Sequence, residues 1–263
     1  METLNTQFET RDDCANYVSD LAYWIEKPHQ LAPFVATRDI ALEQLDHIDF
    51  INYGKTRNFL AGKVTKLSPY ISNHLITLNE VRNKAVTSVN QPKQATKFVQ
   101  ELGWRDFWQR IYEQHPEWIY QSVEEYKTGY QESDYSDTMP DDIVNATTDC
   151  ACINQFITML YNTGYLHNHA RMYLASYIIH WRRISWKAGA RWMHHYLIDG
   201  DLASNNLSWQ WVASTFGNKP YIFNLENVQK YADDTIDVSP ENNQPLDYTY
   251  EALHEQLFPN RNL

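Results

Sequence analysis

The stretch "LIDGDLASNNLSWQWVAS" gathers two aspartates, two adjacent asparagines and two tryptophans. Such amides are costly beside indoles in a core, because a buried polar group without a partner costs about 1–3 kcal/mol. If residues 202–212 form a helix with Asp201 as its N-cap, Asn205 and Trp209 share one face. Trp211 lies about 200° further round that helix and points away. One face would then hold a polar, aromatic ligand, and the opposite indole would serve another surface.

A second mixed face occurs in "ATKFVQELGWRDFWQRIYEQ", residues 95–114. Residues at positions i, i+3, i+4 and i+7 of a helix share one side, and here they are Glu101, Trp104, Arg105 and Trp108. The indoles could stack on a planar ligand while the carboxylate accepts a ring N–H. The alternative is an ion pair between Glu101 and Arg105 beside aromatic side chains that fill a groove.

A third face lies in "HNHARMYLAS". Its side carries Asn168, Arg171, Met172 and Ala175. Arg171 is the only charge there and needs an anionic partner, for which Asp199 and Asp201 are candidates. A structural salt bridge would satisfy the same requirement.

Composition limits the classes of protein that the chain can belong to. With 263 residues it is near the upper limit for one core, and we predict a single domain over residues 1–263, with a core at about 37–230 and a C-terminal tail at 231–263. The N-terminus has no apolar signal segment and no stretch approaches the length of a membrane span, so we expect a cytoplasmic protein. Three cysteines without a CxxC motif support neither a disulfide framework nor a zinc site, and adjacent histidines diverge on a helix, so no metal is expected.

The net charge of −11 argues against a nucleic-acid partner, but the distribution of charges along the chain does not. From Cys150 to Ile198 there is no Asp or Glu, whereas five cations occur: Arg171, Arg182, Arg183, Lys187 and Arg191. Such a segment could form a basic surface for a phosphate backbone. Alternatively, these charges solvate several helix faces that point in different directions.

Helical periodicity dominates, sustained alternation is missing, and we predict an all-α fold. We expect one helix at 37–50 with Thr37 as its N-cap, and a long one at 95–114. A further helix through "HARMYLASYIIHWRRISW" should break near Ala188-Gly189. The acidic residues 113–142 are typical of a solvated loop, and the tail should be loop with one short helix at about 248–257.

Several ordered blocks resemble the C-terminal FAD-binding domain of the DNA photolyase/cryptochrome family. They are Tyr53 with Arg57, "VTKLSPY" at 64–70, "ELGWRDFW" at 101–108, "TGYLHNHARM" at 163–172, "LIDGDLASNNLSWQWVAS" at 197–214 and "YIFN…QK" at 221–230. The resemblance covers about residues 37–230. Full-length members carry an N-terminal α/β antenna domain, so we expect a short, photolyase-like protein without it.

The resemblance implies an all-helical fold that holds FAD in a folded conformation. The cofactor-binding residues that it implies are Tyr53, Thr65, Lys66, Leu67, Ser68, Phe98, Arg105, Asn168, Arg171, Asp199, Gly200, Asp201 and Asn205. Among them Tyr53 and the turn at 65–68 would hold the pyrophosphate. Asn205 matches the position that faces flavin N5, and Trp209 and Trp186 match the first two members of an electron-transfer chain.

By the same resemblance, we expect a deoxyribodipyrimidine photolyase, a carbon–carbon lyase in which photoexcited reduced FAD lends an electron to a cyclobutane pyrimidine dimer. The implied catalytic residues are Asn205, Trp209, Trp186 and Glu101. The implied DNA-binding residues are Arg57, Glu101, Trp104, Asn168, His169, Met172 and Trp211. A lesion must leave the base stack, so single-stranded or distorted DNA is the expected substrate.

Departures from the family pattern keep other functions open. A third chain tryptophan is replaced by Ile143, which leaves Trp181 and Trp192 as candidate donors. Phe98 stands where Trp is frequent, and His169 replaces an Arg and so removes a permanent charge. The alternatives are a cryptochrome-like blue-light sensor without repair activity, and a helical interaction module without a cofactor. The retained lesion-side residues favour repair.

Overall fold

A computed structural model describes residues 4–22 and 32–260. By their contacts they divide into two compact units, Met1–Phe34 and Val35–Leu263. The first unit contains α1 (Arg11–Leu21), which starts at a capping box between Thr10 and Asp13. The single domain predicted over residues 1–263 stays a prediction.

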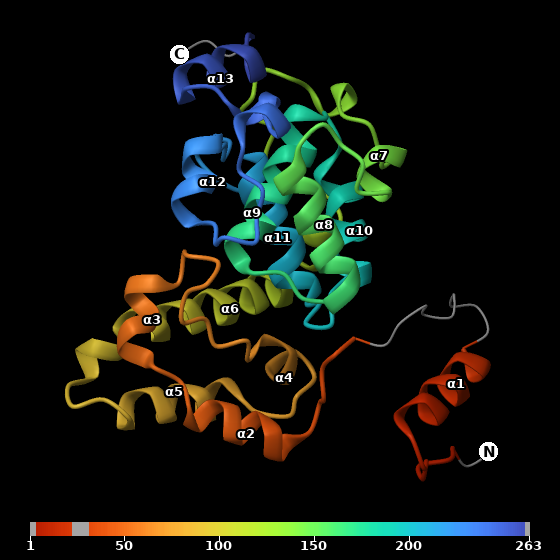
Figure 1. Ribbon diagram of the computed structural model, residues 1–263, viewed down its shortest axis with the longest axis vertical. Helices are drawn as coiled ribbons and strands as arrows, with labels where there is room; N and C mark the ends of the chain where they lie inside the picture. The colour runs from red at the N-terminus through yellow and green to blue at the C-terminus, as the bar shows by residue number, and fades with distance from the viewer. Residues whose placement is uncertain (1–3, 23–31, 261–263) are drawn as a thin grey trace. The chain divides into compact units, whose positions relative to one another are not determined.

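The second unit is a set of helices (Figure 1). They are α2 (Arg38–Asp46), α3 (Phe50–Thr56), α4 (Ser68–Ser72), α5 (Leu78–Thr87), α6 (Thr96–Gln114), α7 (Asp141–Val144), α8 (Ala151–Thr163), α9 (Asn168–Ser176), α10 (Trp186–Tyr196), α11 (Leu202–Ala213), α12 (Leu225–Tyr231) and α13 (Tyr250–Leu257). Within the described residues the β-structure is limited to one isolated bridge, between Ser136 and Ile184. The predicted all-α class is confirmed.

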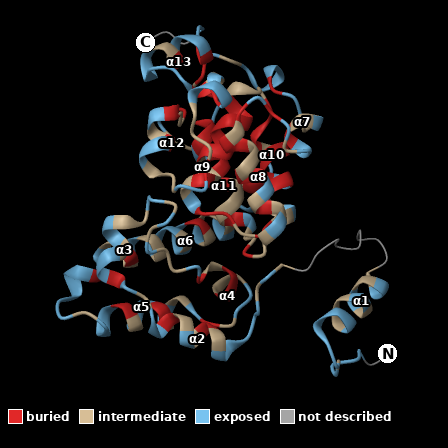
Figure 2. Ribbon diagram, in the orientation of Figure 1, coloured by how far each residue is buried: buried red, intermediate tan, exposed pale blue. Residues whose placement is uncertain are grey.

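The main hydrophobic core lies among α8, α9, α10 and α11, where Figure 2 concentrates the buried residues. Gly189 on α10 faces the ring of Trp209 on α11, and a Cβ at this glycine would come within 2.3 Å of that ring. The glycine therefore serves close packing between two helices. The break predicted near Ala188-Gly189 is wrong, because α10 runs through both residues.

The chain instead turns between the π-helical segment Tyr177–Trp181 and the start of α10. Arg183 has a φ of 51° there, and Ile184 forms the bridge to Ser136. This turn places Ser185 as the N-cap of α10, where its side chain accepts the Lys187 N–H.

Local capping explains where the other helices start. Thr37 accepts the Ile40 N–H and Asp201 accepts the Ser204 N–H, so both predicted N-caps are confirmed. The helix predicted at 37–50 is too long, because α2 ends at Asp46 and Asp49 caps a new helix. The predicted long helix and the short helix of the tail are confirmed as α6 and α13.

The acidic segment 113–142 is less solvated than predicted. It contains short 3-10 turns at Pro116–Ile119 and Glu132–Asp134 as well as α7. Two of its tyrosines, Tyr126 and Tyr135, are buried, and their rings are stacked at 4.1 Å between centroids. The segment therefore buries these two rings while most of its carboxylates face solvent.

The cations between Cys150 and Ile198 follow the alternative interpretation, in which they serve separate helix faces, because four of the five bind different partners. Those partners are Asp199 for Arg171, Asp142 for Arg182, Glu132 for Lys187, and the Tyr130 ring and the Leu257 carbonyl for Arg183. The charges therefore tie parts of the fold together. Among the described residues, no helix is long and apolar enough to cross a membrane.

Candidate functional site

A cavity of about 580 Å³ opens in the second unit. Many residues implied by the resemblance line it: Tyr53, Arg57, Thr65, Lys66, Leu67, Ser68, Phe98, Glu101, Trp104, Arg105, Asn168, His169 and Met172. They come from α3, the turn before α4, α6 and α9. Segments far apart in the sequence therefore meet at one site.

The turn before α4 has the backbone geometry of an anion-binding nest. Lys66 is left-handed, with a φ of 50°, and Leu67 follows in the right-handed helical region. Residues of opposite hand in succession aim neighbouring N–H groups into one concavity, which favours phosphate oxygens. The Lys66 side chain is exposed and adds positive charge to the same turn.

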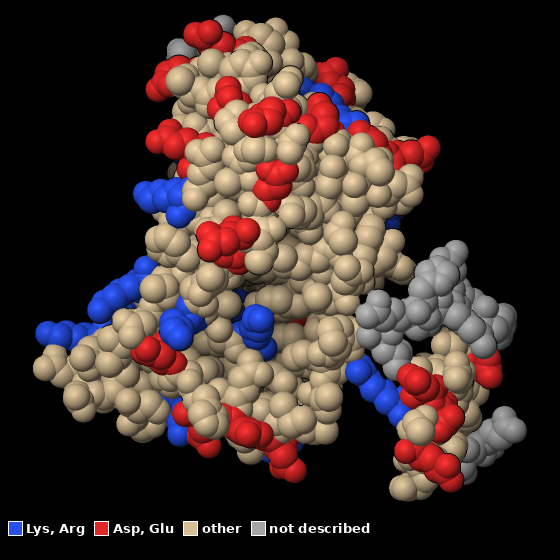
Figure 3. All heavy atoms as spheres, viewed as in Figure 1, with Lys and Arg blue, Asp and Glu red and all other residues tan. Residues whose placement is uncertain are grey.

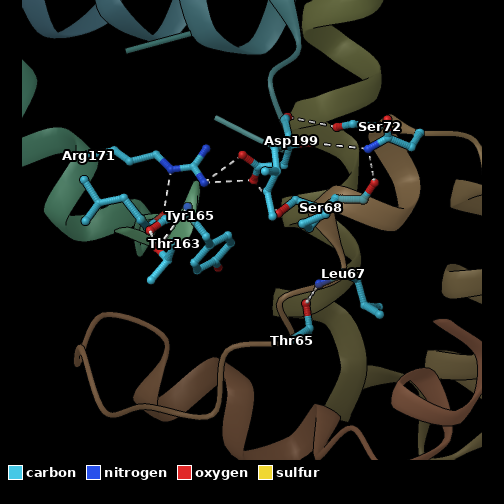
Figure 4. A network of polar contacts seen from close by, with 12 residues as sticks. Thr65, Leu67, Ser68, Ser72, Thr163, Tyr165, Arg171 and Asp199 are labelled. Carbon is cyan, nitrogen blue, oxygen red and sulfur yellow. Dashed lines mark hydrogen bonds and ion pairs between the residues drawn. The ribbon is translucent and has the colours of Figure 1, made fainter. Parts of the chain in front are cut away.

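A buried network centred on Asp199 fixes this turn (Figure 4). The Asp199 carboxylate accepts bonds from Arg171 Nη2 at 2.8 and 3.0 Å and from Ser68 Oγ at 2.6 Å. Ser72 Oγ donates to the Asp199 carbonyl at 3.0 Å. We call Asp199, Arg171, Ser68 and Ser72 the Asp199 network. It joins α4, α9 and the segment before α11, and it confirms Asp199 as the partner of Arg171.

A second carboxylate joins α6 to α11. Asp201 accepts the Ser204 N–H at 2.7 Å, Gln109 Nε2 at 2.5 Å and Arg105 Nη2 at 3.3 Å. Arg105 is therefore paired with Asp201, so the alternative ion pair between Arg105 and Glu101 is not formed. The Asp201 side chain both caps α11 and holds the cavity-lining arginine in place.

Glu101 on α6 is held by two cations. Lys97 Nζ lies 2.7 Å and Arg57 Nη1 lies 3.4 Å from Glu101 Oε1. Burial, followed by the negative charge of Glu101, raises the pKa of the nearby Tyr53 to about 12. Glu101 is thus a carboxylate acceptor on the cavity wall, and Tyr53 is a hydroxyl donor.

Indoles complete the cavity face of α6. The Trp104 ring is stacked on the Trp108 ring at 5.7 Å between centroids and 28° between planes. Trp108 is buried and Trp104 is 52% exposed. An exposed flat ring at the edge of a polar cavity can stack on a planar ligand.

The α9 side of the cavity carries the imidazole of His169, whereas His167, the N-cap of α9, lies outside the lining. His169 Nδ1 lies 2.7 Å from the Asn58 carbonyl oxygen, and its ring packs against the rings of Tyr173 and Tyr231. Burial lowers the pKa of His169, and it lowers the pKa of His167 to about 4. Neither histidine supplies the permanent charge that an arginine would bring to this face.

Other predicted site residues lie around the cavity without lining it. They are Arg171, Trp186, Asp199, Gly200, Asp201, Asn205, Trp209 and Trp211. Asn205 Nδ2 donates to the Ala190 carbonyl at 3.0 Å, and the buried Trp186 donates its indole N–H to Ser122 Oγ at 3.0 Å. Trp209 is buried and Trp211 is 42% exposed, so the two indoles of the opening motif face different environments, as predicted.

A family model for the FAD-binding domain of DNA photolyase matches residues 98–238. The chain belongs to this family.

Its relatives include proteins named as photolyases and as a cryptochrome. A deoxyribodipyrimidine photo-lyase of Alkalihalophilus pseudofirmus is 30% identical over 65% of this chain and 36% of its own length. A putative mitochondrial cryptochrome DASH of Neurospora crassa is 26% identical over 78% of this chain and 33% of its own length. The chain thus spans about a third of the length of these relatives.

Solved structures confirm the fold. An archaeal photolyase from Sulfolobus tokodaii, solved with two FAD molecules, superposes with a TM-score of 0.65 at 23% identity. The match covers 97% of this chain and 57% of that one. The predicted resemblance, the helical FAD-binding fold and FAD as the family cofactor are confirmed.

The photolyase-type cavity fits FAD in volume and in chemistry. Its size lies within the range of about 300–1,000 Å³ that is usual for ligand sites. The nest at Lys66 and Leu67 suits a pyrophosphate, and buried rings suit the two aromatic ring systems. The Ser204 hydroxyl on α11 is buried without a protein partner and lies on a residue that lines the cavity.

Sequence reasoning missed part of the cavity wall. The additional residues are Asn58, Val64, Ile71, Leu102, Tyr165, Ser204, Ser208, Tyr221, Asn227, Tyr231 and Tyr250. The last four come from segments after α11, including α13 of the predicted tail. The large number of tyrosines in the chain, eighteen, was the available signal.

Two places bear on electron supply. Ile143, at the position of the expected third tryptophan, is fully buried in the core. The candidates Trp181 and Trp192 donate their indole N–H groups to the Pro245 carbonyl and to Tyr161 Oη, at 2.9 and 3.2 Å.

Proposed function

We propose that this protein is an FAD-dependent deoxyribodipyrimidine photolyase that repairs cyclobutane pyrimidine dimers, with a preference for single-stranded or distorted DNA. The observation that carries the proposal is that the proposed cofactor residues and the proposed lesion residues line the same cavity. The nest at Lys66 and the lesion-side residues Glu101, Trp104 and Met172 line one cavity. A flavin and a flipped base can therefore meet in it.

The proposed cofactor contacts follow from the donors on this wall. The backbone and hydroxyl groups of residues 65–68 hold the pyrophosphate, and the Asp199 network keeps that turn in shape. With its pKa raised to about 12, Tyr53 stays protonated even at alkaline pH, so it acts as a hydroxyl donor. Bound and photoexcited in its reduced form, FAD supplies the electron that splits the dimer and takes it back.

The proposed lesion contacts use the other part of the wall. Glu101, held by Lys97 and Arg57, accepts an N–H from a pyrimidine edge. Trp104 stacks on the flipped lesion, and Met172 packs against it. Trp211 is proposed to contact the DNA beside the cavity, because its indole is exposed on the opposite side of α11 from Trp209.

The charges near the cavity suit a short stretch of backbone. Figure 3 shows Lys and Arg side chains around the hollow beside α3 and α6, whereas Asp and Glu side chains gather near α13. Arg57 and Lys66 line the cavity itself, but His169 is neutral. With few permanent charges for a duplex, binding favours DNA in which the lesion is already unstacked.

Asn205, Trp209 and Trp186 are proposed to act on the electron supply. The amide of Asn205 is fixed by its bond to the Ala190 carbonyl, and the indoles lie on the packed helices α10 and α11. In this proposal Trp209 and Trp186 pass electrons toward the flavin, and Asn205 holds its polar edge.

A cryptochrome-like blue-light sensor is the second candidate. The neutral His169 favours it, because a sensor does not need a charge for DNA at this position. A relative named as a putative cryptochrome DASH is consistent with either function. The cytoplasmic location stays a prediction.

The test is repair by the purified, chemically reduced protein under blue light. A thymine-dimer oligonucleotide is supplied single-stranded and as a duplex, and recovery of thymine absorbance is followed, with a dark sample as control. We expect light-dependent recovery that is faster on the single strand. A protein that binds FAD but restores no thymine on either substrate would favour the sensor.

A further inference from the structure

Ser204 carries a buried hydroxyl that the fold leaves without a partner. Among the described residues, the buried side-chain atoms lacking a hydrogen bond are Glu101 Oε1, His167 Nε2, His180 Nδ1, Arg183 Nη1 and Ser204 Oγ. Only two of these residues, Glu101 and Ser204, line the cavity. Glu101 still has cations at 2.7 and 3.4 Å, whereas the structure provides no such contact for the Ser204 hydroxyl.

The position of Ser204 in the first turn of α11 explains why its hydroxyl is unpaired. A serine inside a helix usually bonds to the carbonyl four residues earlier. For Ser204 that residue is Gly200, which lies outside the helix, and the Asp201 carbonyl already accepts the Asn205 N–H at 2.8 Å. Asp201 takes the Ser204 backbone N–H through its side chain, so only the backbone of Ser204 is satisfied.

A buried hydroxyl without a partner costs stability, so its retention in a cavity wall indicates a bond to a ligand. We infer that the Ser204 hydroxyl donates a hydrogen bond to an acceptor atom of the bound FAD. The inference deepens the proposed function and rests on its cofactor site. FAD offers carbonyl, ring-nitrogen and phosphate atoms that can accept this hydrogen bond.

The inference predicts opposite effects on the free and the FAD-bound protein. In Ser204→Ala the free protein loses an unsatisfied polar group, and its melting temperature should rise by about 2–4 °C. The FAD-bound protein loses a hydrogen bond, and the Kd for FAD should rise about 3- to 10-fold. A hydroxyl with a structural role would instead lower the melting temperature of the free protein.

The experiment removes FAD from the protein and titrates it back, following flavin fluorescence, and measures melting with and without FAD. Ser88→Ala is the control for the loss of a serine hydroxyl, because Ser88 is exposed and lies outside the cavity lining. We expect its Kd and both melting temperatures to equal those of the unchanged protein.

The outcomes separate the inference from the proposed function. If the unchanged protein binds FAD and Ser204→Ala binds it equally well, the inference is wrong and the cofactor site stands. A lower melting temperature of the free variant would also overturn the inference. If the unchanged protein does not bind FAD at all, both the inference and the proposed function fail.

Discussion

The Asp199 network and the cavity face of α6 border one site but differ in how far their side chains are committed to the protein. The Asp199 side chain is 2% exposed and bonds to Arg171 and Ser68. The Trp104 ring is 52% exposed and contacts only neighbouring rings among its described contacts. We call the Asp199 network the closed region, because its side chains bond to each other, and the cavity face of α6 the open region, because its exposed ring is available to a ligand.

This difference separates two kinds of function. Groups that shape the cofactor turn are bonded to each other, so their loss should damage the fold and the cofactor site together. Groups proposed to meet a lesion, such as Trp104, are exposed and make few contacts, so their loss should leave folding intact. The contrast leads to four tests, from the largest expected effect to the smallest.

Removal of the Asp199 carboxylate should have the largest effect. Asp199→Ala leaves Arg171 half-buried without its counter-ion, and breaking a buried pair costs about 3–5 kcal/mol. We expect that loss in the free energy of unfolding, measured in urea, together with weak FAD binding. The control is Asp106→Ala, which breaks the exposed ion pair with Arg110 and should cost less than about 1 kcal/mol. Equal losses in both variants would contradict the contrast.

Acidification should have the next largest effect, through His167, the buried N-cap of the helix that carries Arg171. Burial lowers the pKa of His167 to about 4, below the unfolded value of about 6.5. The unfolded state then binds more protons, so stability falls as the pH drops through 6.5, by about 2 kcal/mol for this group between pH 7 and 5. His167→Asn keeps an acceptor for the His169 N–H and removes this titration. The free energy of unfolding is measured in urea at pH 7 and pH 5, and it should fall by about 2 kcal/mol less in the variant than in the unchanged protein. An equal fall in both proteins would show that His167 does not cause the loss of stability.

Truncation of Trp104 tests the open region. Trp104→Ala should lower affinity for a dimer-containing single strand about 10-fold, because base stacking on an indole contributes about 1–3 kcal/mol. FAD binding and the free energy of unfolding should change little, because the ring is half exposed. Fluorescence anisotropy gives the affinity, and Tyr120→Ala, another exposed ring but outside the cavity lining, is the control. A Trp104 variant that loses stability instead would place this ring with the closed region.

The two regions also differ in how well the sequence predicted them. Helical spacing predicted the shared face of α6. Arg171 is the only charge on its helix face and therefore needs an anionic partner, for which the sequence offered two candidates, Asp199 and Asp201. The confirmed caps Thr37 and Asp201 follow from side-chain chemistry within three residues of each helix start. These are local relations, which a linear sequence contains.

The failures involve contacts between distant segments. Gly189 resembles a helix breaker until the ring of Trp209 is placed against it. The sequence left two interpretations of the cations after Cys150 open, because it does not show which groups they bind. Tyr250 reaches the cavity from a segment predicted to be a tail. Periodicity describes one helix at a time, so it gave no signal for these contacts.

Restoring charge at His169 is the smallest change and tests the boundary between the regions. His169 lies on the cavity wall but packs against Tyr173 and Tyr231 and bonds to the Asn58 carbonyl, so it belongs partly to each region. His169→Arg adds a permanent cation near the proposed DNA path. If it meets one phosphate, duplex affinity rises a few-fold at low salt, and the slope of log K against log salt steepens by about 0.9. The measurement is duplex binding over a range of salt, with His47→Arg, an exposed position outside the cavity lining, as control. An equal change in the control would show that net charge alone sets duplex binding. The histidine at position 169, where the family pattern has arginine, would then not explain a preference for single strands.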